Sequence, residues 1–394
     1  NEFVRNQKMK YTSLSNVGLI MNSSKEFQSL SQLSVYVKNG IKVENLISET
    51  NESSNLFPNI AFHLLTDPVN GAGNLIDVSQ INKAAMKKAA EFCQKNKFFW
   101  DGVVTQKQNI REFIYQNAAF CLLDFTIKGG QFSLVPTVPI KDDNTIHHEV
   151  ETKKLVKALF TDGNTRNLKV SFLSAEERQL FQARVIFREE VENGFAKTKV
   201  IDKRLRDGSI NDPREIFDMS NFCTSPAHAE TFALYALAVR KFVDHGISFE
   251  TTPDSAMSLE PGDYIRVISE ITHNDRFENG YISGDGVIQS QGSVTPVNEE
   301  IFYWKASFKN PEDGTLTVDD NGLAAEKFRD SVFTVKKTDS TDRIYKVESI
   351  TYTEEGFVSV TGSHQPVISK EINGETVQIF QILDAINDRE TFFT

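Results

Sequence analysis

The residues that could carry out chemistry in this chain are few. Ser225 and His228 lie three positions apart, a spacing that could bring a serine hydroxyl near a histidine base. No acid that would orient the histidine is evident. Pro226 follows Ser225, as happens where a serine caps a helix and a proline occupies the first helical position. We therefore expect Ser225 to cap a helix and not to act as a nucleophile.

The cysteines and histidines do not form a recognisable metal-binding motif. Cys93, Cys121 and Cys223 are odd in number and lack the short spacing of a zinc motif, which favours free, mostly buried thiols made in a reducing compartment. His147 and His148 are adjacent, so their side chains would diverge on a strand or a helix. From these patterns we predict no metal site, no cofactor site and no catalytic residue.

Two further patterns have structural interpretations. Gly71-Ala72-Gly73 lacks the preceding strand and the third glycine of a nucleotide-binding loop. The run at 189–192, Glu-Glu-Val-Glu, falls on a predicted strand, where neighbouring carboxylates point to opposite faces. The sequence contains no P-loop, no Gly-x-Ser-x-Gly and no His-Glu-x-x-His. An enzyme is therefore not predicted.

The composition limits the class of protein. The chain has 394 residues, 39% hydrophobic and 25% charged, as expected for a globular protein of several domains. Its formal net charge of −11 is the opposite of a surface that neutralises phosphates, which counts against a nucleic-acid binder. The chain begins at Asn1 with no signal-peptide pattern, so we expect it to start inside a longer polypeptide.

The first part of the chain is predicted to mix helices and strands. Residues 34–43 are predicted to form a strand pair or one bent strand around the Asn39-Gly40 turn signal, and a polar loop follows at 44–55. Periodicity then predicts a compact α+β unit. Its expected helices are 58–67, 78–96 and 108–119. One strand is expected to start at 98–100, and two more, at 121–126 and 132–136, flank a hairpin turn at 128–130.

The stretch from 219 to 268 reads as cap, helix, strand, turn and strand. The helix starts at Pro226, and Gly246 acts as its stop signal. A half-buried strand at 247–251 and a tight turn at 261–263 lead into a strand at 264–268. Strands are also predicted on both sides of this stretch, at 16–22, 168–173, 183–188, 199–202, 301–308, 331–335, 344–350 and 357–364, with two strand fragments inside 281–292 and a helix or strand at 379–386.

This central stretch carries a family resemblance. Cys-Thr-Ser at 223–225 followed by His-Ala at 228–229, a helix ending in Val-Arg-Lys at 239–241, Ile-Ser-Phe-Glu-Thr-Thr at 247–252 and Leu-Glu-Pro-Gly-Asp at 259–263 resemble the central region of phage tail tip attachment proteins. These form the host-specificity protein J, or baseplate hub, family. Further segments follow in the family's order between about residues 16 and 367: Val37–Val43, Lys128–Pro136, Leu159–Asn164, Tyr345–Ile350 and Phe357–His364.

The resemblance implies a structural virion protein at the phage tail tip. Such a hub is a homotrimer that closes the tail tube, surrounds the DNA exit channel and bears host-recognition parts. Its partners would be the tail tube, distal tail proteins and the tape measure protein. A host receptor would be bound by parts outside this segment, and DNA would pass during ejection without specific binding. An acidic bore would fit this role, because it repels the DNA backbone.

The resulting expectation is a β-rich, multidomain α+β fold. Residues 1–52 would contribute N-terminal strands to a tube-forming hub domain at 146–268, and 53–145 would be an inserted α+β domain. Residues 269–394 would form a small β-barrel or sandwich. Two rival functions are a tail-associated cell-wall-degrading enzyme and a secreted adhesin. The first lacks a converging set of catalytic residues, and the second lacks a signal peptide.

Overall fold

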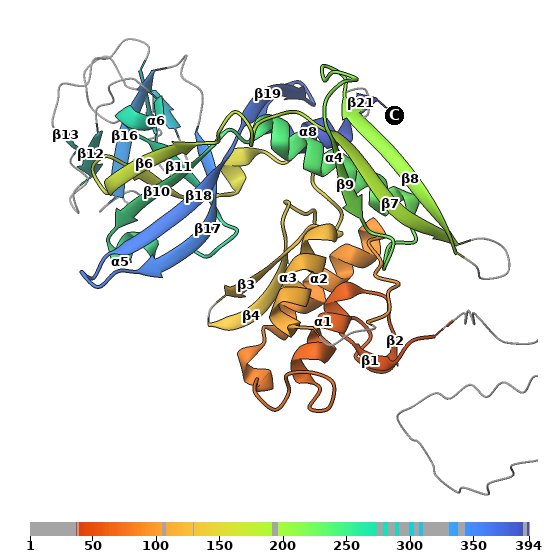
Figure 1. Ribbon diagram of the computed structural model, residues 1–394. Coiled ribbons are helices and arrows are strands. Elements are labelled where there is room, and N and C mark those ends of the chain that lie inside the picture. The colour runs from red at the N-terminus through yellow and green to blue at the C-terminus, as the bar shows by residue number, and fades with distance from the viewer. Residues whose placement is uncertain are drawn as a thin grey trace, which may run out of the picture. The chain divides into compact units, whose positions relative to one another are not determined.

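The computed structural model describes residues 37, 39–104, 108–128, 130–190, 196–273 and 343–388, together with short strands at 279–282, 288–290, 299–302, 307–309, 331–337 and 392–393. These residues form a β-rich, multidomain α+β fold of several sheets and a few helices, as predicted (Figure 1). The strand predicted at 16–22 lies outside the described residues. So does most of the predicted strand segment that precedes Asn39.

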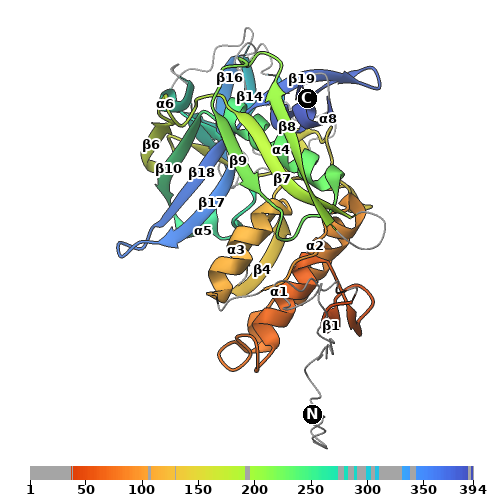
Figure 2. The same ribbon diagram turned by 45° about the vertical axis from the view of Figure 1, so that its right-hand side comes forward.

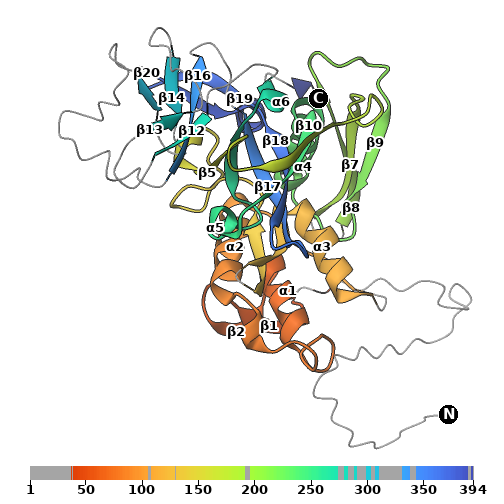
Figure 3. The same ribbon diagram turned by 90° about the vertical axis from the view of Figure 1, so that its left-hand side faces the viewer.

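An α+β unit follows the first described strands, which are β1 (Lys42–Asn45) and β2 (Thr50–Ser53). Its other elements are α1 (Phe57–Thr66), the 3-10 helix η1 (Val78–Gln80), α2 (Lys83–Asn96), α3 (Ile110–Phe120), β3 (Leu123–Lys128) and β4 (Gln131–Pro136). Figure 3 shows α1 beside both α2 and the β1–β2 hairpin. The predicted helices at 58–67 and 108–119 and the hairpin of β3 with β4 are confirmed.

Three predictions in this unit are wrong. The polar loop expected at 44–55 contains the antiparallel pairing of β1 with β2, because polar strands can pair without an apolar face. The strand expected at 98–100 is absent from the structure of these residues, where Phe98 and Trp100 are buried as core anchors instead. The helix expected at 78–96 breaks at Ile81, which forms a bridge with Phe132, so that α2 starts afresh after it.

The largest sheet has six strands in the order β5-β11-β17-β18-β10-β6. All neighbours are antiparallel except β5 and β11. The strands are β5 (Val156–Thr161), β6 (Arg166–Phe172), β10 (His245–Thr251), β11 (Tyr264–Ile268), β17 (Ile344–Tyr352) and β18 (Val358–Gln365). In β10 and β18 every second residue is buried, so one face of the sheet covers a core of its own.

A four-stranded sheet has the order β21-β8-β7-β9. Its strands are β7 (Gln182–Glu190), β8 (Ala196–Leu205), β9 (Arg214–Asp218) and β21 (Phe392–Phe393). Helix α4 (Pro226–Phe242) packs against β7 and β8, and helix α8 (Gln381–Asn387) packs on α4 (Figure 2). Strand β9 was not predicted, since the Asp-Gly and Asp-Pro turn signals before it suggested a loop.

The predicted cap, turn and strand of the central stretch are confirmed. Ser225 caps α4, and the turn before β11 has Gly262 at φ +96°, a conformation that favours glycine. Gly246 is not the helix stop: α4 ends at Phe242, and Gly246 lies inside β10. There a Cβ would approach the carbonyl oxygen of Gly362 on the neighbouring strand to 3.2 Å, so a small residue suits close strand pairing.

The remaining elements are short. Helices α5 (Pro253–Ala256) and α6 (Glu270–His273) flank β11. Strands β12 (Asn279–Ile282), β13 (Ile288–Ser290), β14 (Glu299–Phe302), β15 (Ser307–Lys309) and β16 (Ser331–Lys337) form a five-stranded sheet. Strands β19 (Val367–Ile372) and β20 (Glu375–Phe380) form a hairpin that leads into α8. Part of the aromatic strand predicted at 301–308, residues 303–306, lies outside the described residues.

Strands from both sides of residue 268 share the six-stranded sheet, since β17 and β18 complete it beside β10 and β11. The predicted hub domain at 146–268 and β domain at 269–394 are therefore joined by backbone pairing. The boundaries predicted at 52, 145 and 268 remain predictions. Among the described helices, none is long and apolar enough to cross a membrane.

Candidate functional site

The Ser225–His228 pair has the structural role that was predicted for it. The Ser225 Oγ accepts a hydrogen bond from the backbone N–H of His228 at 3.3 Å, which caps α4. The His228 Nε2–H donates to the carbonyl oxygen of Phe120 at 2.9 Å. His228 is 1% exposed, so no substrate reaches its ring from solvent.

The three cysteines are free and buried, as predicted. The structure adds that Cys121 and Cys223 lie beside His228 and that Cys93 lies beside Cys121, which the sequence did not predict. Cys93 lies on α2, Cys121 directly after α3 and Cys223 directly before the Ser225 cap. Only the folding of α2, α3 and α4 around one core brings these distant positions together.

The thiols and His228 shift one another's pKa values. Contact with the Cys93 thiol, and then with His228, lowers the pKa of Cys121. Burial opposes a charge on His228, but the thiols of Cys121 and Cys223 outweigh it and raise the His228 pKa. The same burial raises the pKa of Cys93. These groups are enclosed in the core and shielded from solvent.

The other motifs of the sequence also find structural roles. A Cβ at Gly71 would lie 2.3 Å from the carbonyl oxygen of Leu64, so this glycine permits a close backbone approach after α1. The His148 Nδ1–H donates to the carbonyl oxygen of Leu383 at 3.1 Å, which anchors α8. In the acidic run, Glu189 pairs with Lys199 at 3.2 Å across β7 and β8, and part of the run lies outside the described residues.

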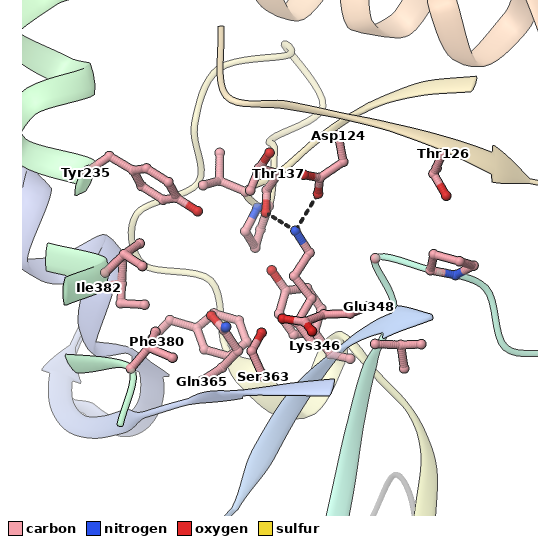
Figure 4. Close-up of a pocket in the computed structure, with 18 of the residues that line it drawn as sticks. Asp124, Thr126, Thr137, Tyr235, Lys346, Glu348, Ser363, Gln365, Phe380 and Ile382 are labelled. Atoms are coloured by element: carbon pink, nitrogen blue, oxygen red, sulfur yellow. Dashed lines mark hydrogen bonds and ion pairs between the residues drawn. The ribbon is translucent and has the colours of Figure 1, made fainter. Parts of the chain in front are cut away.

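A cavity among the described residues has a volume of about 560 Å³ (Figure 4). One wall comes from β3 and the segment after β4, and another comes from the outer face of β17 and β18. Residues of α4 and the start of α8 close it from a third side. Labelled residues of these walls include Asp124, Thr126, Thr137, Tyr235, Lys346, Glu348, Ser363, Gln365, Phe380 and Ile382.

Lys346 is the charged centre of this cavity. Its Nζ donates to Asp124 Oδ2 at 2.7 Å and to the carbonyl oxygen of Thr137 at 3.0 Å (Figure 4). Because the ammonium is already paired, it is poorly suited to act as a nucleophile or a base. Burial raises the pKa of the cavity residues Tyr235 and Tyr264, so both hydroxyls stay neutral at physiological pH. The cavity therefore resembles a joint between the α+β unit and the six-stranded sheet more than a catalytic cleft.

Comparisons with known proteins give structural likenesses only. No protein-family model matches the chain, and no curated protein matches it. A chain from the virion of the native gene transfer agent particle is similar over 72% of this chain and 47% of its own, at 10% identity and a TM-score of 0.34. This chain thus spans about half the length of that protein.

Two tail proteins are also similar. The tail protein of Neisseria meningitidis MC58 matches 77% of this chain and 68% of its own, at 10% identity and a TM-score of 0.32. The 43 kDa tail protein of prophage MuSo2 from Shewanella oneidensis matches 66% of this chain and 56% of its own, at 9% identity and a TM-score of 0.28. At these TM-scores the likeness carries no conclusion about function.

Proposed function

We propose that this chain is a structural hub protein of a phage tail tip, which assembles as a homotrimer around the channel for DNA. One observation carries the proposal. Four of the segments that resemble the hub family, although far apart in sequence, lie together in the six-stranded sheet: 159–164 reaches β5, 247–252 β10, 345–350 β17 and 357–364 β18. The convergence of these four segments on one sheet supports the proposal.

A ring of pseudo-sixfold symmetry needs two sheet units in each subunit. The six-stranded sheet is the first candidate, and the four-stranded sheet of β7, β8, β9 and β21 is the second. Both sheets involve the central stretch 219–268: α4 packs on the four-stranded sheet, and β10, which follows α4 in the chain, is a strand of the six-stranded sheet. The short connection would hold the two units of one subunit at a defined spacing around the ring.

The charge of the chain fits passage of DNA. A trimer carries three times −11, or −33, formally. If acidic side chains line the bore, the phosphate backbone passes without contacts that would slow it. The chain itself would have no catalytic role, because Ser225 is engaged in a cap and the Cys–His cluster is enclosed. Host recognition would lie in parts outside this segment.

Native mass spectrometry and electron microscopy test the proposal together. We expect a species of three times 44.4 kDa, alone or on a purified tail tube, with a central opening wide enough for duplex DNA. A chain that stays monomeric in both settings would contradict the trimer. A ring whose bore is lined by lysines would contradict the electrostatic part and leave the trimer standing.

A further inference from the structure

Three potential metal ligands meet where α4 passes into β10. Asp244 lies between the end of α4 and β10, His245 is the first residue of β10, and His364 lies near the end of β18. The Nδ1 atoms of His245 and His364 lie 2.7 Å and 2.8 Å from the same oxygen, Asp244 Oδ1. The ligand atoms of the three residues all lie within 4.8 Å of one another. The two imidazole rings are stacked, with centroids 4.3 Å apart.

The surroundings hold these groups in place and leave one side open. The side chains of His245 and His364 are 3% and 7% exposed, whereas Asp244 is 31% exposed. The His245 Nε2 lies 2.9 Å from the hydroxyl oxygen of Tyr345, and the ring of Phe172 covers His245. Two potential ligands are thus fixed by the sheet, and the third faces solvent, from which an ion and its remaining water ligands can enter.

We propose that Asp244, His245 and His364 bind a divalent transition-metal ion of the zinc class. Two imidazoles and one carboxylate are ligands that suit Zn²⁺ and related ions, and a site with three protein ligands leaves a position for water. The Tyr345 hydroxyl supplies the outer-shell contact that typically fixes the orientation of a ligating histidine.

Binding requires little change in the protein. Ligand atoms around a tetrahedral Zn²⁺, with bonds of about 2.0–2.1 Å, lie roughly 3.3 Å apart, so each histidine Nδ1 needs to move about half an ångström away from Asp244 Oδ1. Without metal, both Nδ1–H groups donate to the carboxylate of Asp244. With metal, the hydrogen of each neutral ring moves to Nε2, and His245 can then donate it to Tyr345. Neither histidine has to change its net charge.

One nearby charge opposes a cation. Arg343 precedes β17. Burial is the main cause that lowers the pKa of His245 and His364, and the positive charge of Arg343 lowers both further. The same repulsion would weaken binding of a metal ion, and the carboxylate of Asp244 offsets it. We therefore expect Arg343→Gln to tighten metal binding, which a purely hydrogen-bonded network would not predict.

The consequence of binding would be mechanical. The ion would link the segment that ends α4 to two neighbouring strands of the six-stranded sheet, since β10 pairs with β18. The backbone N–H of Leu173 also donates to the carbonyl oxygen of Asp244 at 3.0 Å, which ties β6 to the same point. A bound ion would thus stiffen the connection between the helix that covers one sheet and the edge of the other.

The test uses the full chain, freed of metal with a chelator, and titrated with ZnCl₂ or CoCl₂ alone. Calorimetry with Zn²⁺ and the visible absorption of Co²⁺ should give one ion per chain. His364→Asn keeps a donor toward Asp244 but removes the ligand, and it should weaken binding at least about 100-fold, beyond the 10–100-fold typical of lost outer-shell partners. Tyr345→Phe should weaken binding by about 10-fold at unchanged stoichiometry.

Asp244→Asn serves as the second variant, because it keeps the side-chain size and an oxygen that accepts from both histidines. It decides the question if His364→Asn does not fold. His63→Asn is the matched control. His63 on α1 also lies near a carboxylate, 3.9 Å from that of Asp67 directly after the helix, and its loss should leave metal binding unchanged. The proposal is overturned if the folded chain takes up no ion, or if the folded His364→Asn or Asp244→Asn variant binds as tightly as the parent.

Discussion

The ion pair of Lys346 with Asp124 provides a sharp test of how the α+β unit is fixed to the six-stranded sheet. Replacing Lys346 by Met keeps the length of the buried stem and removes two hydrogen bonds, to Asp124 at 2.7 Å and to the carbonyl of Thr137 at 3.0 Å. The Lys346 side chain is 13% exposed, so its bonds are largely shielded from water. Hydrogen bonds to charged groups contribute about 1.5–3 kcal/mol each, and removal of the buried charge recovers part of that.

The expected net loss for Lys346→Met is about 2 kcal/mol in the free energy of unfolding. Asp124→Asn should cost less, about 1 kcal/mol, because the Asp124 side chain is 43% exposed and rehydrates. Since the two residues touch, the double variant should lose less than the sum of the single losses. Urea denaturation followed by circular dichroism measures all three variants against the parent.

The control for this experiment is Lys199→Met. Lys199 pairs with Glu189 at 3.2 Å, but both side chains are well exposed, at 50% and 41%. Surface pairs of this kind add little, so the urea midpoint should not move measurably. If Lys346→Met is as stable as the parent, or if its effect simply adds to that of Asp124→Asn, the pair is not a tie between the two units and the reasoning fails.

Three further predictions test other parts of the structure. Ser225→Ala should lower the free energy of unfolding by about 1 kcal/mol through loss of the α4 cap, while Ser225→Asn should retain most of it, both by urea denaturation. Gly71→Ala should destabilise by about 1–3 kcal/mol, because its Cβ would lie 2.3 Å from the carbonyl oxygen of Leu64, whereas Gly40→Ala has nothing within 4 Å of the new atom and should be neutral. Burial first, opposed by the hydrogen bond to Asp244, lowers the pKa of His364 from 6.5 to about 4. Because the unfolded chain binds this proton more readily than the folded chain, the free energy of unfolding should fall as the pH drops from about 6.5 towards 4. His364→Asn should flatten that slope when melting is measured as a function of pH. The other groups that face the His364 ring are Asp244, His245, Arg343 and Tyr345.

Local sequence patterns predicted those features that depend on only a few neighbouring residues. The Ser-Pro start of α4 was predictable because a cap needs only its own side chain and the N–H groups of the next turn. The turn at Gly262 was predictable for the same reason, since its positive φ is a property of one residue. Gly246 misled because a glycine after a helix usually ends it, whereas here it serves the pairing of β10 with β18.

What the sequence could not reveal depends on contacts between distant positions. β17 and β18 alternate like any half-buried strands, and nothing in them indicates that they complete a sheet begun at β5 and β10. The same holds for the cavity around Lys346, whose partners Asp124 and Thr137 lie more than two hundred residues earlier. A spacing rule cannot find such a site, because its spacing is set by the fold.

The histidine pairs illustrate this limit most clearly. His147 and His148 stand out in the sequence because they are adjacent, yet the His148 ring is hydrogen-bonded to the carbonyl oxygen of Leu383 in α8. His245 and His364 are 119 positions apart, and their rings stack because β10 and β18 are antiparallel neighbours with Gly246 opposite Ser363. Asp244 reaches both rings only because α4 ends two residues before it. Three ordinary features, a helix end and two strand ends, thus place a carboxylate between two imidazoles. Sheet register, and not sequence spacing, therefore determines where this chain can gather ligands.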